Sequence, residues 1–212
     1  YRTKYSKELL NNLGKMIKEN KLGEEDRWGS NNDLWAICNI GEESLVEYLS
    51  FLDNYTNETN YNTLADIASS IRKLDRLFYY ESWWPKSKDK ILSKLAPIYK
   101  KHLNNLGWDK KIGEPIEDVL MRSLCVGFCG FALDLEVITE AKSRYAKKQI
   151  DPDLASPIHS IVAMNGKEKE YKEMLARYED EKDVEYKIKL LIGLYQFYNQ
   201  EILEKALDFA FT

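Results

Sequence analysis

Glycine, proline and histidine are all scarce in this sequence. Among 212 residues there are 10 Gly, 5 Pro and 2 His. So few turn-forming residues argue against a β-sandwich, which needs a turn after every short strand. No apolar run approaches the roughly 20 residues that a helix needs to cross a bilayer, so we expect no membrane partner. The formal net charge of -4 argues against a dedicated nucleic-acid binder, so we expect no nucleic-acid partner.

Cysteine is also sparse, with only Cys38, Cys125 and Cys129. An odd number indicates reduced thiols and therefore a cytoplasmic protein. Cys125 and Cys129 share a helix face, either as half of a metal or redox site or as two small buried side chains. The second interpretation is favoured because free cysteine is among the most buried residue types. Glycosylation patterns begin at Asn54 and Asn57, and we interpret them as chance matches in an Asn-rich chain.

The sequence contains no pattern for a catalytic zinc site. Such a site in a zinc peptidase needs His-Glu-x-x-His on one helix, with both histidines as ligands and the glutamate as base. His102 and His159 lie far apart, and neither is followed by Glu. We expect the His159 side chain to lie in the core or at its rim, and the His102 side chain to lie on the surface. We therefore expect no catalytic residue and no metal site in this chain.

What the sequence does contain is a succession of amphipathic helices. Apolar residues recur at helical spacing along nearly the whole chain, which predicts an all-α fold of about ten helices. Antiparallel pairs of roughly 40 residues favour stacking in a HEAT- or armadillo-like superhelix. The expected ranges are about 7–20, 24–39, 45–52, 61–79, 88–106, 116–131, 135–149, 151–164, 171–178, 184–197 and 201–211.

Single residues mark several of the expected helix ends. Ser6 is a suitable N-cap, and Gly23 suits the left-handed conformation that closes the first helix. Gly41 is expected to break the second helix, whose apolar side includes Trp28. Pro97 lies inside the fifth helix and predicts a kink or a break there.

The segment 81–90 is expected to be a loop. Trp84 precedes Pro85, and the residue before a proline avoids the helical region. Trp83 and Trp84 could form an exposed binding surface or a packing plug beneath the loop, and the plug is favoured. The three lysines that follow are explained by solvation alone.

Three cations of the helix at 61–79 form the candidate site. Arg72, Lys73 and Arg76 lie at the edge of the apolar stripe or away from it. They could hold a carboxylate, such as the C-terminus of a peptide, through charge-assisted hydrogen bonds. The alternative is a solvated helix face that pairs with Asp66, Asp75 or a neighbouring helix. From the residues alone the alternative is favoured, because surface ion pairs are common.

Seven short matches, in order along the chain, resemble the C-terminal, ERAP-like helical domain of the M1-type zinc aminopeptidases. Leu64 stands where that family usually has Trp, and Met121 where it usually has Leu. Among members of that family, the sequence resembles microbial enzymes similar to the tricorn-interacting factors. The matches are Tyr1-Arg2-x-x-Tyr5, Asp26-Arg27 with Asp33, Glu58-x-x-Tyr61, Leu106-Gly107-Trp108 with Gly113-Glu114, Met121-Arg122, Pro152-Asp153-Leu154 and Asn165-Gly166.

The resemblance implies how the chain is divided. Residues 1–5 would be the end of a preceding β-sandwich domain or a linker, and Tyr1 to Tyr5 could end a strand. Residues 6–212 would be an ERAP-like helical-repeat domain that is truncated at its C-terminal end. The chain starts without Met, so we expect it to be a piece of a longer polypeptide.

The resemblance also implies a function. The parent enzyme would remove N-terminal amino acids from peptides with one zinc, and this domain would cover the catalytic cleft without being active itself. Its partners would be the preceding catalytic domain of the same chain and the peptide substrate. In some members a side chain at the position of Arg72 or Lys73 helps to hold the far end of the peptide. The rival hypothesis is a free-standing HEAT-like scaffold that binds a protein partner.

Overall fold

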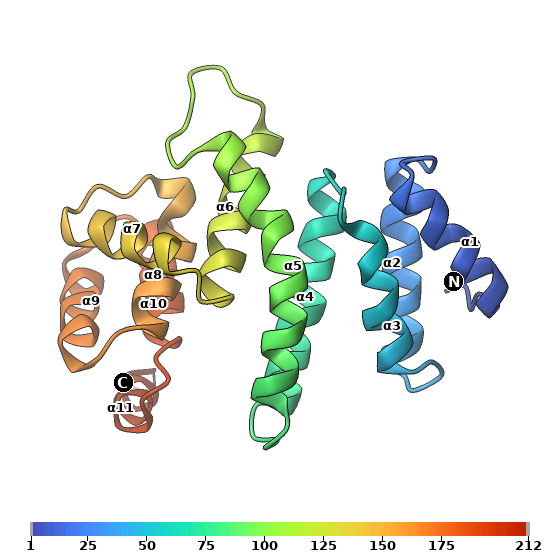
Figure 1. The fold of residues 1–212 in the computed structure, drawn as a ribbon. Helices are drawn as coiled ribbons and strands as arrows, with labels where there is room; N and C mark the ends of the chain where they lie inside the picture. Colours follow the sequence, from blue (N-terminus) through green and yellow to red (C-terminus); the bar gives the residue numbers. More distant parts are fainter. Residues whose placement is uncertain (1, 211–212) are drawn as a thin grey trace. The chain divides into compact units, whose positions relative to one another are not determined.

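The chain is all-helical in the computed structural model, which describes residues 2–210 (Figure 1). This confirms the predicted fold class. No strand occurs in that range, and residues 2–5 carry no regular secondary structure. Predictions that involve Tyr1, Phe211 or Thr212 lie outside the described residues. The elements are α1 (Lys7–Lys18), α2 (Glu24–Asn39), α3 (Leu45–Phe51), η1 (Leu52–Tyr55), α4 (Tyr61–Phe78), α5 (Trp84–Leu106), α6 (Ile116–Phe131), α7 (Leu135–Ala146), η2 (Pro152–Leu154), α8 (Ala155–Met164), α9 (Glu168–Asp180), α10 (Val184–Leu194) and α11 (Gln200–Ala210).

Several helix ends follow the local sequence as predicted. The Ser6 hydroxyl accepts a hydrogen bond of 3.2 Å from the Leu9 amide and caps α1. Gly41 follows α2 with a φ of 78°, which glycine adopts without the steric cost of a side chain. The predicted bounds of α2 and α6 are confirmed at both ends. Within residues 2–210, no helix combines the length and the apolar character that crossing a membrane requires.

Two predictions near the start of α2 are wrong. Gly23 has a φ of -60° and is the N-cap of α2, whereas Asn20, with a φ of 53°, takes the left-handed conformation after α1. Asparagine tolerates that region better than most residues. Trp28 was expected to face the core but is 41% exposed. The buried side of α2 is instead formed partly by polar residues, among them Arg27 and Asn31.

The predicted loop at 81–90 is also wrong, because α5 begins at Trp84. Pro85 lies in the first helical turn, where its missing N–H needs no partner. Trp84 is 2% exposed, so its indole packs in the core as the favoured interpretation predicted. Trp83 is 48% exposed and lies at the surface. Pro97 does not break α5, which continues to Leu106.

Residues Tyr1–Ile98 form one compact unit. In this unit α2 packs along α4, and α1 and α3 pack against η1. Figure 1 shows α4 and the first part of α5 side by side and joined by a short turn. The largest side chains of this unit that are fully buried come from α3, η1 and α4, namely Tyr48, Tyr55, Leu64, Ile67 and Ile71.

Residues Tyr99–Thr212 form a second compact unit. Helix α8 is its centre, because α6, α7 and α10 all pack against it. Gly130 of α6 lies so close to Ile161 of α8 that an added Cβ would overlap the isoleucine side chain. Consecutive helices pack against one another within the units, and their stacking as antiparallel pairs into a HEAT-like superhelix stays a prediction.

Candidate peptide-binding site

Helix α4 carries the three predicted binding residues, and its two faces differ sharply. Asn60 caps the helix, since its side-chain oxygen accepts a hydrogen bond of 3.1 Å from the Thr63 amide. Leu64, Ile67 and Ile71 are at most 1% exposed and hold one face of α4 in the core. The opposite face is left for polar residues, as the helical period predicts.

Arg72, Lys73 and Arg76 lie towards the end of α4, on or beside this outer face. Arg72 is partly buried, and Lys73 and Arg76 are exposed. Residues three or four apart on a helix are neighbours, so Arg72 and Lys73 both lie next to Arg76. The structure therefore brings the three predicted residues together in one cationic surface of α4.

The carboxylates that were expected to pair with these cations have other partners. Asp75 accepts hydrogen bonds of 2.8 Å from the Trp84 indole and 3.1 Å from the Lys88 ammonium. Asp66 accepts hydrogen bonds of 2.8 and 3.1 Å from two asparagine side chains of α2. Neither exposed cation of α4 forms an ion pair within residues 2–210, so pairing with Asp66 or Asp75 is not how they are stabilised.

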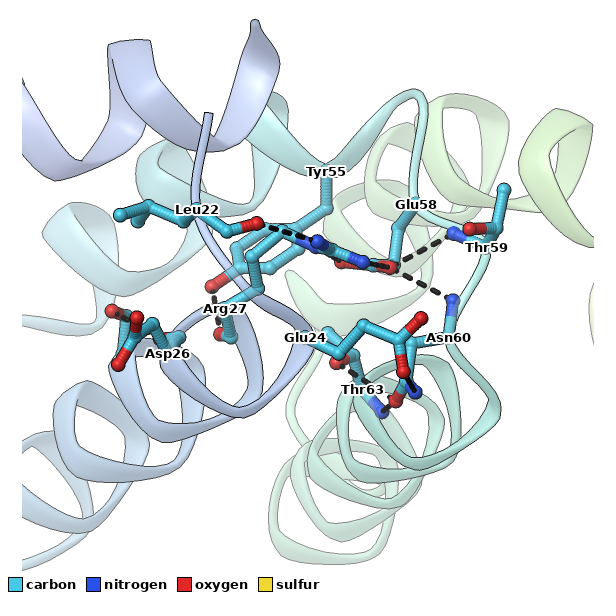
Figure 2. Close-up of polar contacts among 10 residues, drawn as sticks. Leu22, Glu24, Asp26, Arg27, Tyr55, Glu58, Thr59, Asn60 and Thr63 are labelled. Atoms are coloured by element: carbon cyan, nitrogen blue, oxygen red, sulfur yellow. Dashed lines mark hydrogen bonds and ion pairs between the residues drawn. The ribbon is translucent and has the colours of Figure 1, made fainter. Parts of the chain in front are cut away.

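A buried arginine fixes the loops that precede α2 and α4 (Figure 2). Arg27 donates two hydrogen bonds to the Glu58 carboxylate, at 2.8 and 2.9 Å, and a third of 2.8 Å to the backbone oxygen of Leu22. The Tyr55 hydroxyl donates to the backbone oxygen of Arg27 at 2.7 Å. These bonds tie η1 and the following loop to the start of α2.

Glu58 is held as a carboxylate inside the protein. Burial opposes its charged form, but hydrogen bonds from Arg27 and from the Thr59 and Asn60 amides outweigh it and lower the pKa of Glu58. The Glu58 carboxylate in turn raises the pKa of Arg27 through the same hydrogen bonds. Because Asn60 is the cap of α4, this pair sets where the helix with the candidate site begins.

The second unit contains a similar arrangement. Arg122 is 2% exposed and donates to both oxygens of Glu114, at 2.7 and 2.6 Å. Its Nε atom also donates to the backbone oxygen of Gly107 at 2.9 Å. The paired hydrogen bonds from Arg122 lower the pKa of Glu114. Arg122 thus joins α6 to the loop after α5.

Sequence reasoning singled out these four charged residues as family matches but did not pair them. Their pairing depends on separations of 31 and 8 residues across loops, which no periodicity encodes. An arginine and a glutamate that both occur in family matches would have been the usable signal. Asp33, which belongs to the same family match as Arg27, accepts hydrogen bonds from Arg2, Thr3 and Tyr5 and anchors the first residues to α2.

The two histidines do not belong to a metal site in the described part of the chain. His159 is fully buried between the rings of Tyr145 and Tyr186, at centroid distances of 5.9 and 5.6 Å. Both of its ring nitrogens lack a hydrogen-bond partner there. His102 is partly exposed on α5. No group of three or more metal-ligating side chains is found among residues 2–210.

Cys125 and Cys129 are both fully buried, as the favoured interpretation predicted. Burial raises the pKa of Cys129 to about 12, and it raises that of Cys125 further. A thiol with so high a pKa is a poor nucleophile and a poor metal ligand, because both roles need the thiolate. These two residues therefore act as small core side chains.

These features define a class of protein, namely an all-α domain of packed helices whose loops are fixed by buried Arg–Glu pairs. The model of the ERAP1-like C-terminal domain family matches residues 1–212. The chain belongs to this family, which confirms the resemblance drawn from the sequence.

Two of the relatives described next are named aminopeptidases. Aminopeptidase 2 of Candida albicans is 28% identical over 97% of this chain and 23% of its own length. The alanine/arginine aminopeptidase of Saccharomyces cerevisiae is 28% identical over 98% of this chain and 24% of its own. Tricorn protease-interacting factor F2 of Thermoplasma volcanium is 26% identical over 73% of this chain and 18% of its own length. The chain thus spans about a quarter of the length of the first two relatives.

Proposed function

We propose that this chain is the C-terminal domain of an M1-type zinc aminopeptidase in the cytoplasm. The parent enzyme removes N-terminal amino acids from peptides, and this domain covers the catalytic cleft and helps to bind the peptide. The zinc and its ligands lie in the preceding catalytic domain of the same polypeptide. The domain alone is inactive, since it contributes binding and access rather than the reacting groups.

The match of the family across residues 1–212 is the observation that carries this proposal. It is supported by relatives that are named aminopeptidases and that align with this chain over almost its full length. It is supported also by the outer face of α4, where Lys73 and Arg76 are exposed and form no ion pair with described residues.

Arg72, Lys73 and Arg76 bind the far end of the peptide in this proposal. A peptide with its N-terminus at the zinc presents a C-terminal carboxylate at a distance that grows with its length. Charge-assisted hydrogen bonds from arginine and lysine to a carboxylate are roughly twice as strong as neutral ones. The buried Arg27–Glu58 pair keeps the start of α4 fixed, so the backbone that carries these cations needs little rearrangement when the peptide binds.

The test is a double variant, Arg72→Ala with Lys73→Ala, in the full-length enzyme. We expect the Michaelis constant to rise several-fold for peptides long enough to reach α4, and to stay unchanged for dipeptides. The matched control is Lys15→Ala with Lys18→Ala, which removes two exposed cations of α1 that also form no ion pair in residues 2–210. Unchanged Michaelis constants at every peptide length would refute the binding role.

The parent activity is tested separately by the mass and zinc content of the native polypeptide. We expect a chain about four times longer than this one, in line with the relatives, with one zinc per molecule. Peptidase activity should be lost when the zinc is chelated and should return when zinc is restored. A native chain of this size without zinc would instead favour the free-standing scaffold.

A further inference from the structure

An exposed apolar surface lies where α4 turns into α5. Its members are Leu77, Tyr79, Tyr80 and Trp83, which are 66%, 45%, 95% and 48% exposed. We call these four residues the aromatic tip. Single exposed apolar residues are ordinary, but contiguous exposed apolar side chains mark interaction sites. Four such residues within seven positions, at the turn between α4 and α5, need an explanation.

The aromatic tip rests on a rigid base. Phe78 packs against Trp83 and Trp84, with ring centroids 5.0 and 5.5 Å away. Trp84 is buried and its indole donates a hydrogen bond of 2.8 Å to Asp75, which also binds Lys88. These contacts hold the end of α4 against the start of α5 and fix the position of the Trp83 ring. A preformed surface loses less conformational entropy on binding than a flexible one.

The charge around the aromatic tip is opposite in sign to that of the whole chain. Residues 72–90 contain six cations and three carboxylates, whereas the chain has a net charge of -4. The Asp75 carboxylate is already paired with Lys88. Four of the cations are exposed and form no ion pair within residues 2–210, namely Lys73, Arg76, Lys86 and Lys90. The tip is therefore an apolar surface inside a locally cationic rim.

We propose that the aromatic tip is a docking surface for an acidic protein segment that carries one or two large apolar side chains. Tryptophan, tyrosine and arginine are the residues most enriched at binding hot spots, and all three occur here. The apolar side chains of the segment pack on Tyr80 and Trp83, and its carboxylates pair with the cationic rim. This inference goes beyond the proposed aminopeptidase role and does not depend on it.

A protein segment fits this surface better than a lipid bilayer or a nucleic acid does. Glu81 and Asp89 are exposed within the same region and would repel a uniformly anionic surface. A folded or extended segment can place its carboxylates beside the cations and avoid those two residues.

The test measures binding of three labelled peptides to the full-length protein by fluorescence anisotropy. All three share a Phe and a Leu at the same positions, and the remaining residues are Asp and Glu, or Lys and Arg, or Ser. We expect the acidic peptide to bind at least tenfold more tightly than the basic one. Its affinity should fall several-fold between 50 and 500 mM salt, because exposed charge pairs are screened.

Variants of the aromatic tip test whether the acidic peptide binds there. Trp83→Ser and Tyr80→Ser should each weaken the acidic peptide at least tenfold. Ile112→Ser is the control, because Ile112 is an equally exposed apolar residue in another loop. Tyr80 is almost entirely exposed, so its replacement tests the tip even if loss of Trp83 disturbs the contact with Phe78.

Several results would overturn the proposal. They are equal affinity for the acidic and basic peptides, unchanged binding by Tyr80→Ser, and no measurable binding of the acidic peptide. Binding of phosphatidylserine vesicles or of polyuridylate that depends on Trp83, without binding of the acidic peptide, would assign the tip to a lipid or nucleic-acid partner instead. None of these measurements uses peptidase activity. Lys73 and Arg76 belong both to the rim and to the proposed peptide site, so the Tyr80→Ser variant, which changes neither cation, separates the two proposals.

Discussion

Arg27 and Glu58 lie 31 residues apart in the chain and form a two-pronged ion pair with N–O distances of 2.8 and 2.9 Å. The Glu58 side chain is completely buried, and that of Arg27 is 10% exposed. All the side-chain nitrogens of Arg27 and both carboxylate oxygens of Glu58 form hydrogen bonds. Arg27 also donates to the backbone oxygen of Leu22, and Glu58 also accepts hydrogen bonds from two backbone amides. The pair fixes two loops at once.

Removing Arg27 should therefore destabilise the unit Tyr1–Ile98 strongly. Arg27→Ala leaves the Glu58 charge buried without its partner, and the expected loss is about 3–5 kcal/mol of unfolding free energy. Urea unfolding followed by circular dichroism measures it. Arg2→Ala is the control, because Arg2 is half-exposed where it meets Asp33, and it should cost at most about 1 kcal/mol. Similar small losses for both variants would contradict a structural role for the buried pair.

His159 should make the protein sensitive to acid. Burial lowers its pKa to about 4, with a further contribution from the positive charges of Arg177 and Lys189. The unfolded chain binds this proton near pH 6.5, so the unfolded state holds more protons than the folded state between pH 6.5 and 4. The His159 contribution is thus complete above pH 6.5 and is lost as the pH falls towards 4, by about 3 kcal/mol.

The measurement for His159 is the unfolding free energy as a function of pH. His159→Leu should flatten the slope between pH 6.5 and 4, whatever its effect on stability at neutral pH. His102→Gln should keep the original slope in that interval. If His159→Leu and the wild type lose stability in parallel, the buried imidazole is not the group that responds.

Two glycines in helices should respond oppositely to the same substitution. A Cβ at Gly130 would overlap Ile161, so Gly130→Ala should cost about 1–3 kcal/mol through overpacking. A Cβ at Gly29 meets nothing within 4 Å, so Gly29→Ala should stabilise α2 by about 0.5–1 kcal/mol. Thermal unfolding of both variants gives the sign directly.

A second substitution tests the cause at Gly130. Ile161→Ala removes both side-chain atoms of α8 that a Cβ at Gly130 would overlap, so Gly130→Ala should cost less in an Ile161→Ala background. The coupling between the two changes should be about 0.5 kcal/mol or more, since the side chains would touch. Additive effects would mean that the cost at Gly130 arises elsewhere.

The three cysteines should react with a disulfide reagent in a fixed order. Burial raises the pKa of all three thiols. Cys38 is only partly buried, so its sulfur is the most accessible to a reagent. Cys125 and Cys129 are closed to solvent, so at pH 8 they should react at least about a hundredfold more slowly than Cys38. Cys38→Ser should remove the fast phase, and urea should expose two thiols in that variant. A fast phase that survives Cys38→Ser would contradict the burial of the other two.

Much of the fold could be predicted from helical periodicity. The bounds of α2 and α6 follow from apolar spacing between clear stop residues, and the buried stripe of α4 follows from the same period. Errors occur where two rules compete. Pro85 was interpreted as a helix barrier, but its place in the first turn of α5 makes it compatible with the helix. Asn20 rather than Gly23 closes α1, although both tolerate the left-handed region.

The candidate site was only partly predictable for a physical reason. The period of α4 indicates which side Arg72, Lys73 and Arg76 occupy, because that depends on local geometry alone. It does not indicate that Asp75 binds Lys88 and Trp84, since that choice depends on where α5 begins. The exposure of Lys73 and Arg76 without an ion pair among described residues is thus a result of tertiary structure.

Both buried arginines have a consequence for how the sequence can change over time. Arg27 and Arg122 each reach a loop through a backbone oxygen, at Leu22 and Gly107. A backbone oxygen is present whatever side chain the residue carries. Substitutions at Leu22 that keep the loop conformation therefore preserve the bond, whereas Gly107 is limited by its φ of 75° rather than by this contact. Descendants of this chain can therefore change the side chain at Leu22 while each arginine and its glutamate must be inherited together.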